Sequence, residues 1–287
     1  MRVGIIGTGE MGSGVGGWLV AHGADAYTSL NGRSVASAER VRRAGIAAVE
    51  DMTALARTCT IVLSIVPPDQ AFGVAENFAE ACDDEIVTSV FVDCNAIAPE
   101  TSRAIGNAIE SVPLGYVDAG IIGGPPADGY GGPRIYACEP HAATFAELNA
   151  HGLHVVTVEG EIGTASALKM CYGGITKGVI GIGAAMFACA ERAGVADMLA
   201  QEFASSQKAL DTYLTARIPK CARSRRSAAA SRASPTCTKA LPSAMRRSLK
   251  RAPQKIRAER KSRATARRPL NRVAADRLRR IANEYPA

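Results

Sequence analysis

Apolar and polar positions alternate along the first two thirds of the chain in a way that predicts strands followed by helices. Short apolar runs predict strands at residues 2–7, 24–30, 44–49, 60–68, 89–99 and 115–124. Segments with helical spacing predict helices at residues 12–23, 51–59, 69–82 and 100–112. This order of elements is typical of an α/β fold with a doubly wound parallel sheet.

A longer apolar segment follows at residues 161–194 and predicts one helix that ends at Gly194. Lys169, Gly173 and Lys177 are four residues apart, so they share roughly one face of this helix. A lysine among apolar residues is costly unless it is paired or used, and burial would lower its pKa toward that of a proton carrier. A lysine whose amine reaches solvent is the alternative.

The first predicted strand runs into the segment "GTGEMG", in which Gly7, Gly9 and Gly12 have the G-x-G-x-x-G spacing. The first glycine permits a tight turn, the second lets a pyrophosphate approach the backbone, and the third lets the helix pack close to the sheet. We therefore expect the phosphates of a dinucleotide at the start of this helix. The expected contacts are Gly7, Thr8, Gly9, Glu10, Met11 and Gly12. A glycine-rich turn without a ligand is the alternative.

The second predicted strand ends without the Asp or Glu that usually holds the ribose of NAD. Asn31, Arg33 and Ser34 stand there instead, where a 2′-phosphate would lie. Because a guanidinium offers a fork of donors that suits phosphate, NADP is favoured over NAD. The alternative is that Arg33 is a solvated charge in a loop.

Ligands of open α/β sheets lie beyond the carboxyl ends of the strands. Later strands of the predicted sheet end near Val66, Pro67 and Pro68, near Asn95, and near Gly123 and Gly124. We expect these residues to surround one crevice. Residues 1–160 are therefore predicted to form an NADP-binding Rossmann domain, followed by an all-α domain that begins at residues 161–217.

The composition mainly argues against certain classes of protein, namely membrane-spanning, disulfide-rich and metal-binding ones. The chain has 287 residues, of which 47% are hydrophobic and 21% charged, and this is ordinary for a soluble globular protein. The longest uninterrupted candidate for a membrane span, residues 178–190, is too short, so no membrane partner is expected. Eight cysteines without a C-x-x-C pair indicate reduced thiols in a cytoplasm and no metal site.

Charge separates the chain into two parts. Residues 1–215 carry 12 Lys and Arg against 24 Asp and Glu, whereas residues 216–287 carry 22 against 3. Residues 218–287 are rich in Arg, Ala, Ser and Pro, and no aromatic residue occurs between Tyr213 and Tyr285. Such a composition cannot bury enough apolar surface to fold alone. A shifted reading frame, a disordered tail and a basic arm for nucleic acid are the interpretations, the last being disfavoured.

The motifs "GIIGTGEMGSGVG", "SIVPP", "VDCNAIAP", "VDAGIIGGPP" and "GTASALKMCYGGITKG" together resemble the β-hydroxyacid dehydrogenases. This is the family of 3-hydroxyisobutyrate and 6-phosphogluconate dehydrogenases. The resemblance covers about residues 1–218 and is greatest to a bacterial subgroup with its own C-terminal helical domain. It implies NAD(P)-dependent oxidation of a β-hydroxyacid by a homodimer.

The resemblance also implies roles for particular residues. The family's G-x-x-x-x-x-K pattern is met by Gly163 and Lys169, which makes Lys169 the general acid and base. The substrate loop falls on Ile122, Gly123 and Gly124. The family commonly has Ser at position 122 and Asn at position 173, where this chain has Ile and Gly, so the substrate is expected to differ or to be less polar. Lys177 is a substitute anion partner, unless it caps the helix or faces solvent.

Other functions stay open at this point. An imine reductase shares this architecture and the preference for NADPH, although such relatives usually place another residue at position 169. A protein that binds a dinucleotide without turnover is a further alternative, because an altered C-terminus would impair catalysis.

Overall fold

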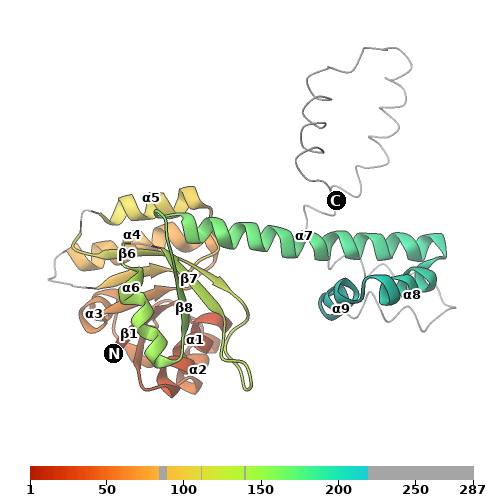
Figure 1. Ribbon diagram of the computed structural model, residues 1–287. Helices are drawn as coiled ribbons and strands as arrows, with labels where there is room; N and C mark the ends of the chain where they lie inside the picture. Colours follow the sequence, from red (N-terminus) through yellow and green to blue (C-terminus); the bar gives the residue numbers. More distant parts are fainter. Residues whose placement is uncertain (84–88, 111, 139, 219–287) are drawn as a thin grey trace, which may run out of the picture. The chain divides into compact units, whose positions relative to one another are not determined.

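The computed structural model describes residues 1–218 except 84–88, 111 and 139. Within these residues, eight strands form one sheet in the order β3-β2-β1-β4-β5-β6-β7-β8 (Figure 1). The strands are β1 Arg2–Ile6, β2 Asp25–Ser29, β3 Ala47–Val49, β4 Ile61–Ser64, β5 Val90–Asp93, β6 Gly115–Ile122, β7 Arg134–Cys138 and β8 His154–Val158. Neighbouring strands are parallel except β6 and β7, which are antiparallel. The chain reverses its strand order after β3, where β4 pairs with the other side of β1.

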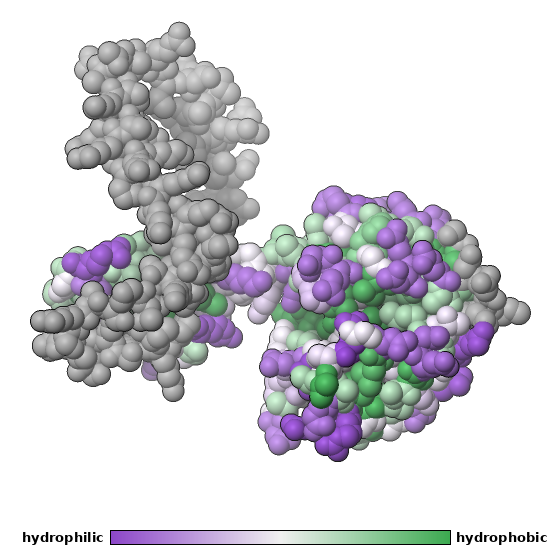
Figure 2. Space-filling view, turned by 180° about the vertical axis from the view of Figure 1, so that it is seen from behind, coloured by the Kyte–Doolittle hydropathy of each residue, from purple (hydrophilic) through white to green (hydrophobic). Residues whose placement is uncertain are grey.

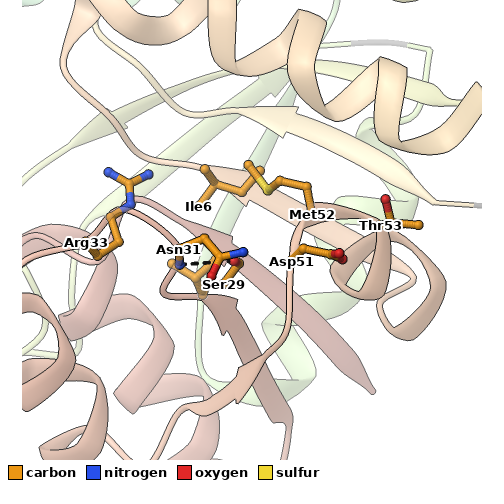
Figure 3. A pocket seen from close by; sticks show the side chains of 8 residues that line it. Ile6, Ser29, Asn31, Arg33, Asp51, Met52 and Thr53 are labelled. Carbon is orange, nitrogen blue, oxygen red and sulfur yellow. Dashed lines mark hydrogen bonds between the residues drawn. The ribbon is translucent and has the colours of Figure 1, made fainter.

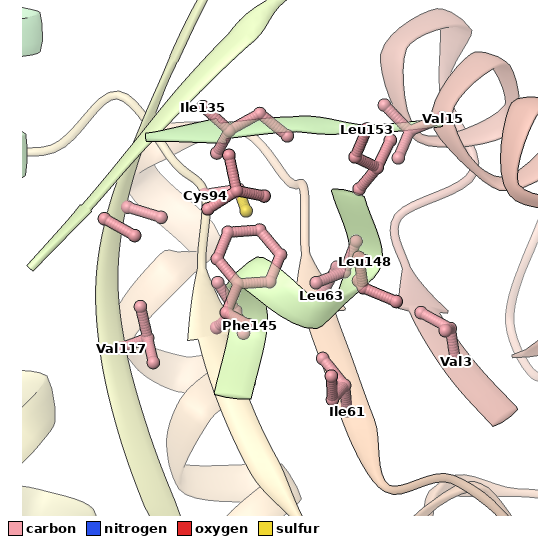
Figure 4. Close-up of a cluster of buried hydrophobic side chains, with 14 of the residues drawn as sticks. Val3, Val15, Ile61, Leu63, Cys94, Val117, Ile135, Phe145, Leu148 and Leu153 are labelled. Carbon is pink, nitrogen blue, oxygen red and sulfur yellow. The ribbon is translucent and has the colours of Figure 1, made fainter. Parts of the chain in front are cut away.

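Helices pack on both faces of this sheet. Those of the Rossmann part are α1 Glu10–Ala21, α2 Val35–Arg43, α3 Met52–Thr58, α4 Ala71–Asp83, α5 Pro99–Ile109 and α6 Ala142–Ala146, with 3-10 turns η1 Pro68–Gln70 and η2 Glu147–His151. One core joins α1, α6 and η2 to the sheet, and Figure 4 shows Val15, Phe145 and Leu148 packed there against strand residues. A second core joins α3, α4 and α5 to the sheet. The predicted doubly wound α/β fold is confirmed.

Three further helices follow the sheet, namely α7 Thr164–Ala193, α8 Ala196–Ser206 and α9 Lys208–Arg217. The chain divides into two compact units, the first ending at Gly183 and the second beginning at Ala184, so the division lies within α7. On the face of the first unit in Figure 2, hydrophobic side chains stand between hydrophilic ones. The predicted properties of residues 219–287, including the shifted reading frame and the basic arm, lie outside the described residues.

The sequence argument against a membrane span considered only the uninterrupted apolar residues 178–190, whereas the continuous helix α7 has 30 residues. Over the described residues, α7 is long and apolar enough to cross a membrane by length and composition, with a mean hydropathy of 1.4. Only 6% of its most apolar 18-residue stretch is buried within the structure, which is not the burial of a core helix. One such helix is weak evidence and does not assign this chain to a membrane.

Four elements of the first unit were not predicted. They are α2, β7, α6 and β8. α2 buries only Val41 and ends in three arginines, so its sequence lacks an apolar stripe. β7 and β8 extend the sheet beyond β6, and these two strands are parallel to each other and run opposite to β6. The long helix starts at Thr164 instead of residue 161, because Gly163 adopts a φ of +102° that a helix cannot contain.

Candidate active site

The glycine loop between β1 and α1 contains two glycines that the fold itself requires. Gly7 has a φ of +93°, and a Cβ there would lie 2.2 Å from the carbonyl oxygen of Ile65. A Cβ on Gly12 would lie 2.0 Å from the carbonyl oxygen of Gly7. Both positions therefore exclude every other residue, whether or not a ligand binds.

Gly9 differs from its two neighbours in the motif. It is exposed, has an extended backbone with a φ of −69°, and a Cβ there would meet no protein atom within 4 Å. No contact within the described residues explains a glycine at this position. A pyrophosphate that approaches the backbone at the start of α1 does explain it. The loop therefore fits the group that its spacing predicts.

An arginine that sequence reasoning missed holds this loop from α2. The Arg40 Nε donates a hydrogen bond of 3.0 Å to the carbonyl oxygen of Thr8, and its guanidinium also donates to the hydroxyl of Ser37 at 2.9 Å. Thr8 is buried, whereas Glu10 lines a separate groove with Ser13. Met11 packs against the core under α1. No spacing in the sequence connects position 40 with position 8.

A pocket of about 270 Å³ lies at the carboxyl ends of the first strands (Figure 3). Asn31 and Arg33 line it from the loop after β2, and Met52 and Thr53 line it from the start of α3. The remaining lining residues are Ile5, Ile6, Ser29 and Asp51. Figure 3 shows Arg33 at one side of the pocket and Thr53 at the other. The β3–α3 residues were not predicted, although the carboxyl end of a neighbouring strand was the signal that could have indicated them.

Ser34 has a different task in the structure. Its hydroxyl accepts a hydrogen bond of 3.2 Å from the backbone N–H of Ser37 and so caps the start of α2. It does not line the pocket that Asn31 and Arg33 line. Of the three predicted 2′-phosphate contacts, two face the pocket and the third supports the helix behind them.

A buried polar network joins the ends of β4 and β5. The Asn95 Oδ1 accepts a hydrogen bond of 2.7 Å from the backbone N–H of Val66, and its Nδ2 donates to the Ser64 hydroxyl at 3.1 Å. The Asp93 Oδ1 accepts from the Asn95 N–H at 2.8 Å. Asn95 therefore holds the start of the Val66–Pro67–Pro68 segment at the strand ends.

The Asp93 carboxyl is the group of this network whose burial costs free energy. Its Oδ2 is buried and has no hydrogen-bond partner. The pKa of the Asp93 carboxyl is raised to about 6, chiefly by burial and also by the nearby charge of Asp118, while the hydrogen bonds from Asn95 lower it. A protonated carboxyl reduces the cost of this burial.

Strand β6 ends at Ile122 and leads into Gly123 and Gly124, the predicted substrate loop. Gly123 has a φ of +138°, and a Cβ there would lie 2.5 Å from the Tyr130 hydroxyl oxygen. Gly124 has no atom within 4 Å of its Cβ position. This segment thus contains one glycine that the fold needs and one, like Gly9, whose Cβ position is surrounded by open space.

The start of α7 is fixed by a buried carboxylate on β6. The Asp118 Oδ2 accepts hydrogen bonds from the N–H groups of Gly163 at 2.9 Å and Ser166 at 3.1 Å. Its Oδ1 accepts from the Ser166 hydroxyl at 2.5 Å. Asp118 therefore satisfies N–H groups at the helix N-terminus that would otherwise lack partners. The glycine of the G-x-x-x-x-x-K pattern is needed for its positive φ and for this N–H.

Lys169 lies one turn further along α7 and returns to the same strand. Its Nζ donates a hydrogen bond to the carbonyl oxygen of Ile121, one residue before Ile122. A Cβ on Gly120 would lie 2.9 Å from the Lys169 Cβ, so only glycine lets the helix approach β6 this closely. Burial lowers the pKa of the Lys169 amine, and the positive charge of Lys177 lowers it further. The amine is thus placed beside the substrate loop and shifted toward its neutral form.

The other two helix positions are less engaged. Gly173 is half-buried, and a Cβ there would meet no atom within 4 Å. Lys177 is exposed. Both lie on the side of α7 that carries Lys169, as the spacing of four residues requires.

Known sequences and structures that resemble this chain identify its family. The family profile of the NAD-binding domain of 6-phosphogluconate dehydrogenase matches residues 2–142. A conserved protein of unknown function, whose structure reveals similarity with 3-hydroxyacid dehydrogenases, is 31% identical over 79% of this chain and 84% of its own, with a TM-score of 0.61. The chain belongs to the β-hydroxyacid dehydrogenase family. The profile match makes residues 2–142 an NAD(P)-binding domain.

Three further similar proteins are an uncharacterised sequence and two solved structures. An uncharacterised 28.5 kDa protein of Methanothermus fervidus is 27% identical over 69% of this chain and 74% of its own length. A 3-hydroxyisobutyrate dehydrogenase of Salmonella typhimurium is 20% identical, covers 70% of this chain and 71% of its own, and has a TM-score of 0.58. A Streptomyces aurantiacus imine reductase is also 20% identical, covers 76% and 78%, and has a TM-score of 0.56. These two structures share the fold.

Proposed function

We propose that this β-hydroxyacid dehydrogenase family member transfers a hydride between NADP and a β-hydroxyacid-like substrate, with Lys169 as general acid and base. The observation that carries the proposal is the position of the Lys169 amine. It is held on the Ile121 carbonyl, beside residues 122–124, and burial lowers its pKa. A family enzyme needs a proton carrier at this end of β6.

The preference for NADP is supported by the pocket after β2. Arg33 and Asn31 line it, and neither Asp nor Glu stands at the end of β2, where an NAD-binding carboxylate is usual. A guanidinium offers several donors to a 2′-phosphate. NAD is the less favoured cofactor.

The residues of the chain divide the chemistry among them. When bound, NADP supplies a nicotinamide that accepts a hydride from the substrate carbon or returns it. The neutral Lys169 amine takes the hydroxyl proton during oxidation, and its ammonium form returns that proton to the carbonyl oxygen during reduction. The Ile121 carbonyl keeps the amine at the strand end, so the proton is exchanged at one place.

The substrate is expected to differ from those of better-known family members or to be less polar. Ile122 and Gly173 replace the Ser and Asn that bind substrate oxygens elsewhere in the family, and neither can donate a side-chain hydrogen bond. Lys177 is the proposed anion partner, because it is exposed and lies two turns from Lys169 on the same side of α7.

We also propose a cytoplasmic homodimer. On α7, Ile175 and Ile182 expose 69% and 67% of their surface, which is unusual for large apolar side chains on one helix of a monomer. Light scattering during size-exclusion chromatography should give twice the chain mass, and a single chain mass would exclude the dimer. The eight cysteines without a C-x-x-C pair are in keeping with a reducing compartment.

The first test is a titration with NADPH and then NADH, followed through the fluorescence of Trp18, the one tryptophan of the chain. Trp18 lies on the part of α1 far from the glycine loop, and its indole donates a hydrogen bond of 2.8 Å to the Gly152 carbonyl. We therefore expect energy transfer to a reduced nicotinamide instead of direct contact. Saturable quenching should be tighter with NADPH. Arg33→Gln should remove this preference, whereas Arg42→Gln, which changes an exposed α2 arginine paired with Glu39, should keep it.

The second test is turnover on a panel of β-hydroxyacids and cyclic imines. We expect NADP reduction with at least one hydroxyacid, and loss of at least 100-fold in kcat for Lys169→Ala, since an acid–base group contributes about 10²–10⁴-fold. Turnover of cyclic imines alone would assign the chain to imine reduction. Cofactor binding without any turnover would leave a dinucleotide-binding protein.

A further inference from the structure

The loop after β6 begins and ends at two strand residues that pair with each other. Ile122 pairs with Arg134 across β6 and β7, so residues 123–133 leave and return at neighbouring points. Inside it, the Ala127 N–H donates to the Tyr130 carbonyl at 3.1 Å, and the Tyr130 N–H donates to the Ala127 carbonyl at 2.9 Å. We call residues 123–133 the β6–β7 loop. It contains Gly123 and Gly124 of the proposed substrate site.

Close internal contacts leave this loop little freedom to adjust. A Cβ on Gly123 would lie 2.5 Å from the Tyr130 hydroxyl oxygen and 2.9 Å from the Pro133 Cα. Gly132 has a φ of +100°, and a Cβ there would lie 2.9 Å from the Pro126 Cγ. The proline rings at positions 125 and 126 also fix two φ angles. A push at one point of the loop is therefore expected to move the loop as a unit.

The loop touches the cofactor-binding helix at one glycine. A Cβ on Gly14 of α1 would lie 2.9 Å from the Pro125 Cβ and 3.5 Å from the Pro126 Cδ. The proline pair thus rests on the α1 backbone where a side chain is missing. Gly14 comes two residues after Gly12, so this contact lies in the helix whose first turn forms the phosphate loop.

We propose that Gly14 is a positioning residue that seats the β6–β7 loop on α1 and so sets the place of Gly123 and Gly124 in the substrate site. The proposal rests on the proposed function for the role of these two glycines. It goes beyond the cofactor motif, which needs glycine at positions 7, 9 and 12 but makes no demand on position 14.

A methyl group at position 14 should act on the loop and spare the fold. Contacts of a real Cβ below 3.0 Å essentially do not occur, so this contact must open in a Gly14→Ala variant, and we expect the exposed Pro125 to move. Alanine is also a better helix former than glycine by about 1 kcal/mol, which helps to keep α1 intact. A displacement near 1 Å can cost about 10²-fold in rate, so we expect a five- to tenfold rise in the substrate KM for a partial shift.

Gly17→Ala is the matched control. Gly17 lies one turn later on α1 and lines the same groove of about 790 Å³ as Gly14 and Pro125. The three atoms nearest to a Cβ there all belong to Ala44, at the end of α2, and the Ala44 Cβ is 3.2 Å away. Both variants add one methyl group and the same helix propensity to the same helix. The methyl group at position 14 meets the loop first, whereas the one at position 17 meets α2 first.

The experiment combines native-state proteolysis with kinetics on the full chain. Tyr130 is 43% exposed, so chymotrypsin cleavage after Tyr130, followed by mass spectrometry, reports on the seating of the loop. We expect Gly14→Ala to be cleaved there several-fold faster and to show the higher substrate KM, with the NADPH Kd changed less than twofold. Gly17→Ala should match the wild type in all three measurements.

The outcomes separate this proposal from the proposed function. Cleavage of Gly14→Ala at the wild-type rate would overturn the seating of the loop. Faster cleavage with an unchanged substrate KM would overturn the link to the substrate site. If the wild type turns over no substrate, the proposed function fails first, and the cleavage rates still decide whether Gly14 seats the loop.

Discussion

Replacing Asp118 should loosen the start of α7 by an amount that its hydrogen bonds set. In the wild type the carboxylate accepts from the N–H groups of Gly163 and Ser166 and from the Ser166 hydroxyl, and it is fully buried. Asparagine has the same shape and can keep one oxygen toward the two N–H groups. Its amide can face the Ser166 hydroxyl, which then accepts. Asp118→Asn therefore removes the negative charge and keeps the bonds.

For Asp118→Asn the magnitude follows from the change of charged hydrogen bonds into neutral ones. A hydrogen bond to a charged group contributes about 1.5–3 kcal/mol, and a neutral one about 0.5–1.5 kcal/mol. Asp118→Asn should thus cost about 2 kcal/mol of the free energy of unfolding. Asp118→Ala leaves two buried N–H groups unsatisfied at about 1–3 kcal/mol each and opens a small cavity, so we expect about 4 kcal/mol.

Thermal and urea unfolding measure these costs, with circular dichroism as the signal. At about 2–4 °C per kcal/mol for a domain of this size, Asp118→Asn should lower the Tm by about 4–8 °C. Ser166→Ala removes the hydroxyl bond to the carboxylate alone and should cost about 2 kcal/mol. In the double variant the costs should fall short of the sum, because both residues share one bond.

Activity gives a second readout that a loss of stability alone would not move. Lys169 follows Ser166 by three residues, so a loosened helix start should misplace the amine and lower kcat at temperatures where the variant is folded. The NADPH Kd should stay within twofold, because the cofactor loop lies on β1 and α1. An Asp118→Asn variant within 0.5 kcal/mol of the wild type, or additive costs with Ser166→Ala, would refute this account of the helix start.

Three further predictions test single groups of the site. Gly9→Val should raise the NADPH Kd at least tenfold in fluorescence titrations while the Tm stays within about 2 °C, because its Cβ meets only open space; unchanged affinity would contradict a phosphate at this position. Lys177→Met should raise the pKa seen in the pH profile of kcat/KM for oxidation, because the charge of Lys177 lowers the pKa of Lys169; an unmoved profile would remove this coupling. Asp93 has its pKa raised from 3.8 to about 6, so its contribution to stability is full below pH 3.8 and is lost, by about 3 kcal/mol, as the pH rises to about 6. Asp93→Asn should abolish that part of the pH dependence in urea unfolding at pH 4–7, and equal slopes for variant and wild type would contradict it.

The parallel part of the fold could be predicted because its signals are local. Strands β1, β4 and β5 are short apolar runs whose residues are buried on both faces, and turn signals separate them from amphipathic helices. α2 is mostly polar and α6 has only five residues, so these two helices lack such signals. β7 (RIYAC) and β8 (HVVTV) do contain β-branched or aromatic residues, so the sequence offered a strand signal there that was missed. A local pattern does not contain the direction of these two strands, which the antiparallel pairing of β7 with β6 decides.

The same distinction applies to the site. Lys169, Arg33 and the glycine loop were predicted because each stands in a motif or at a strand end. Asp118 and Arg40 were not, since their partners lie 45 and 32 residues away in the chain. Such support residues become visible only when the fold brings the partners together. Asp118 lies in the quoted segment "VDAGIIGGPP", but its letters do not reveal which groups it binds, and Arg40 lies in no quoted motif. Both residues hold motif residues in place.

The three glycines of the motif show why spacing alone does not prove a ligand. Gly7 and Gly12 would be required by their contacts with Ile65 and with each other even in a protein that binds nothing. A protein that needed Gly7 and Gly12 only for the turn would have the same two residues at these positions. Gly9 alone has no neighbour that demands it. The case for a bound phosphate therefore rests on the one glycine that the fold does not need, and an affinity measurement on Gly9→Val tests the ligand separately from the turn.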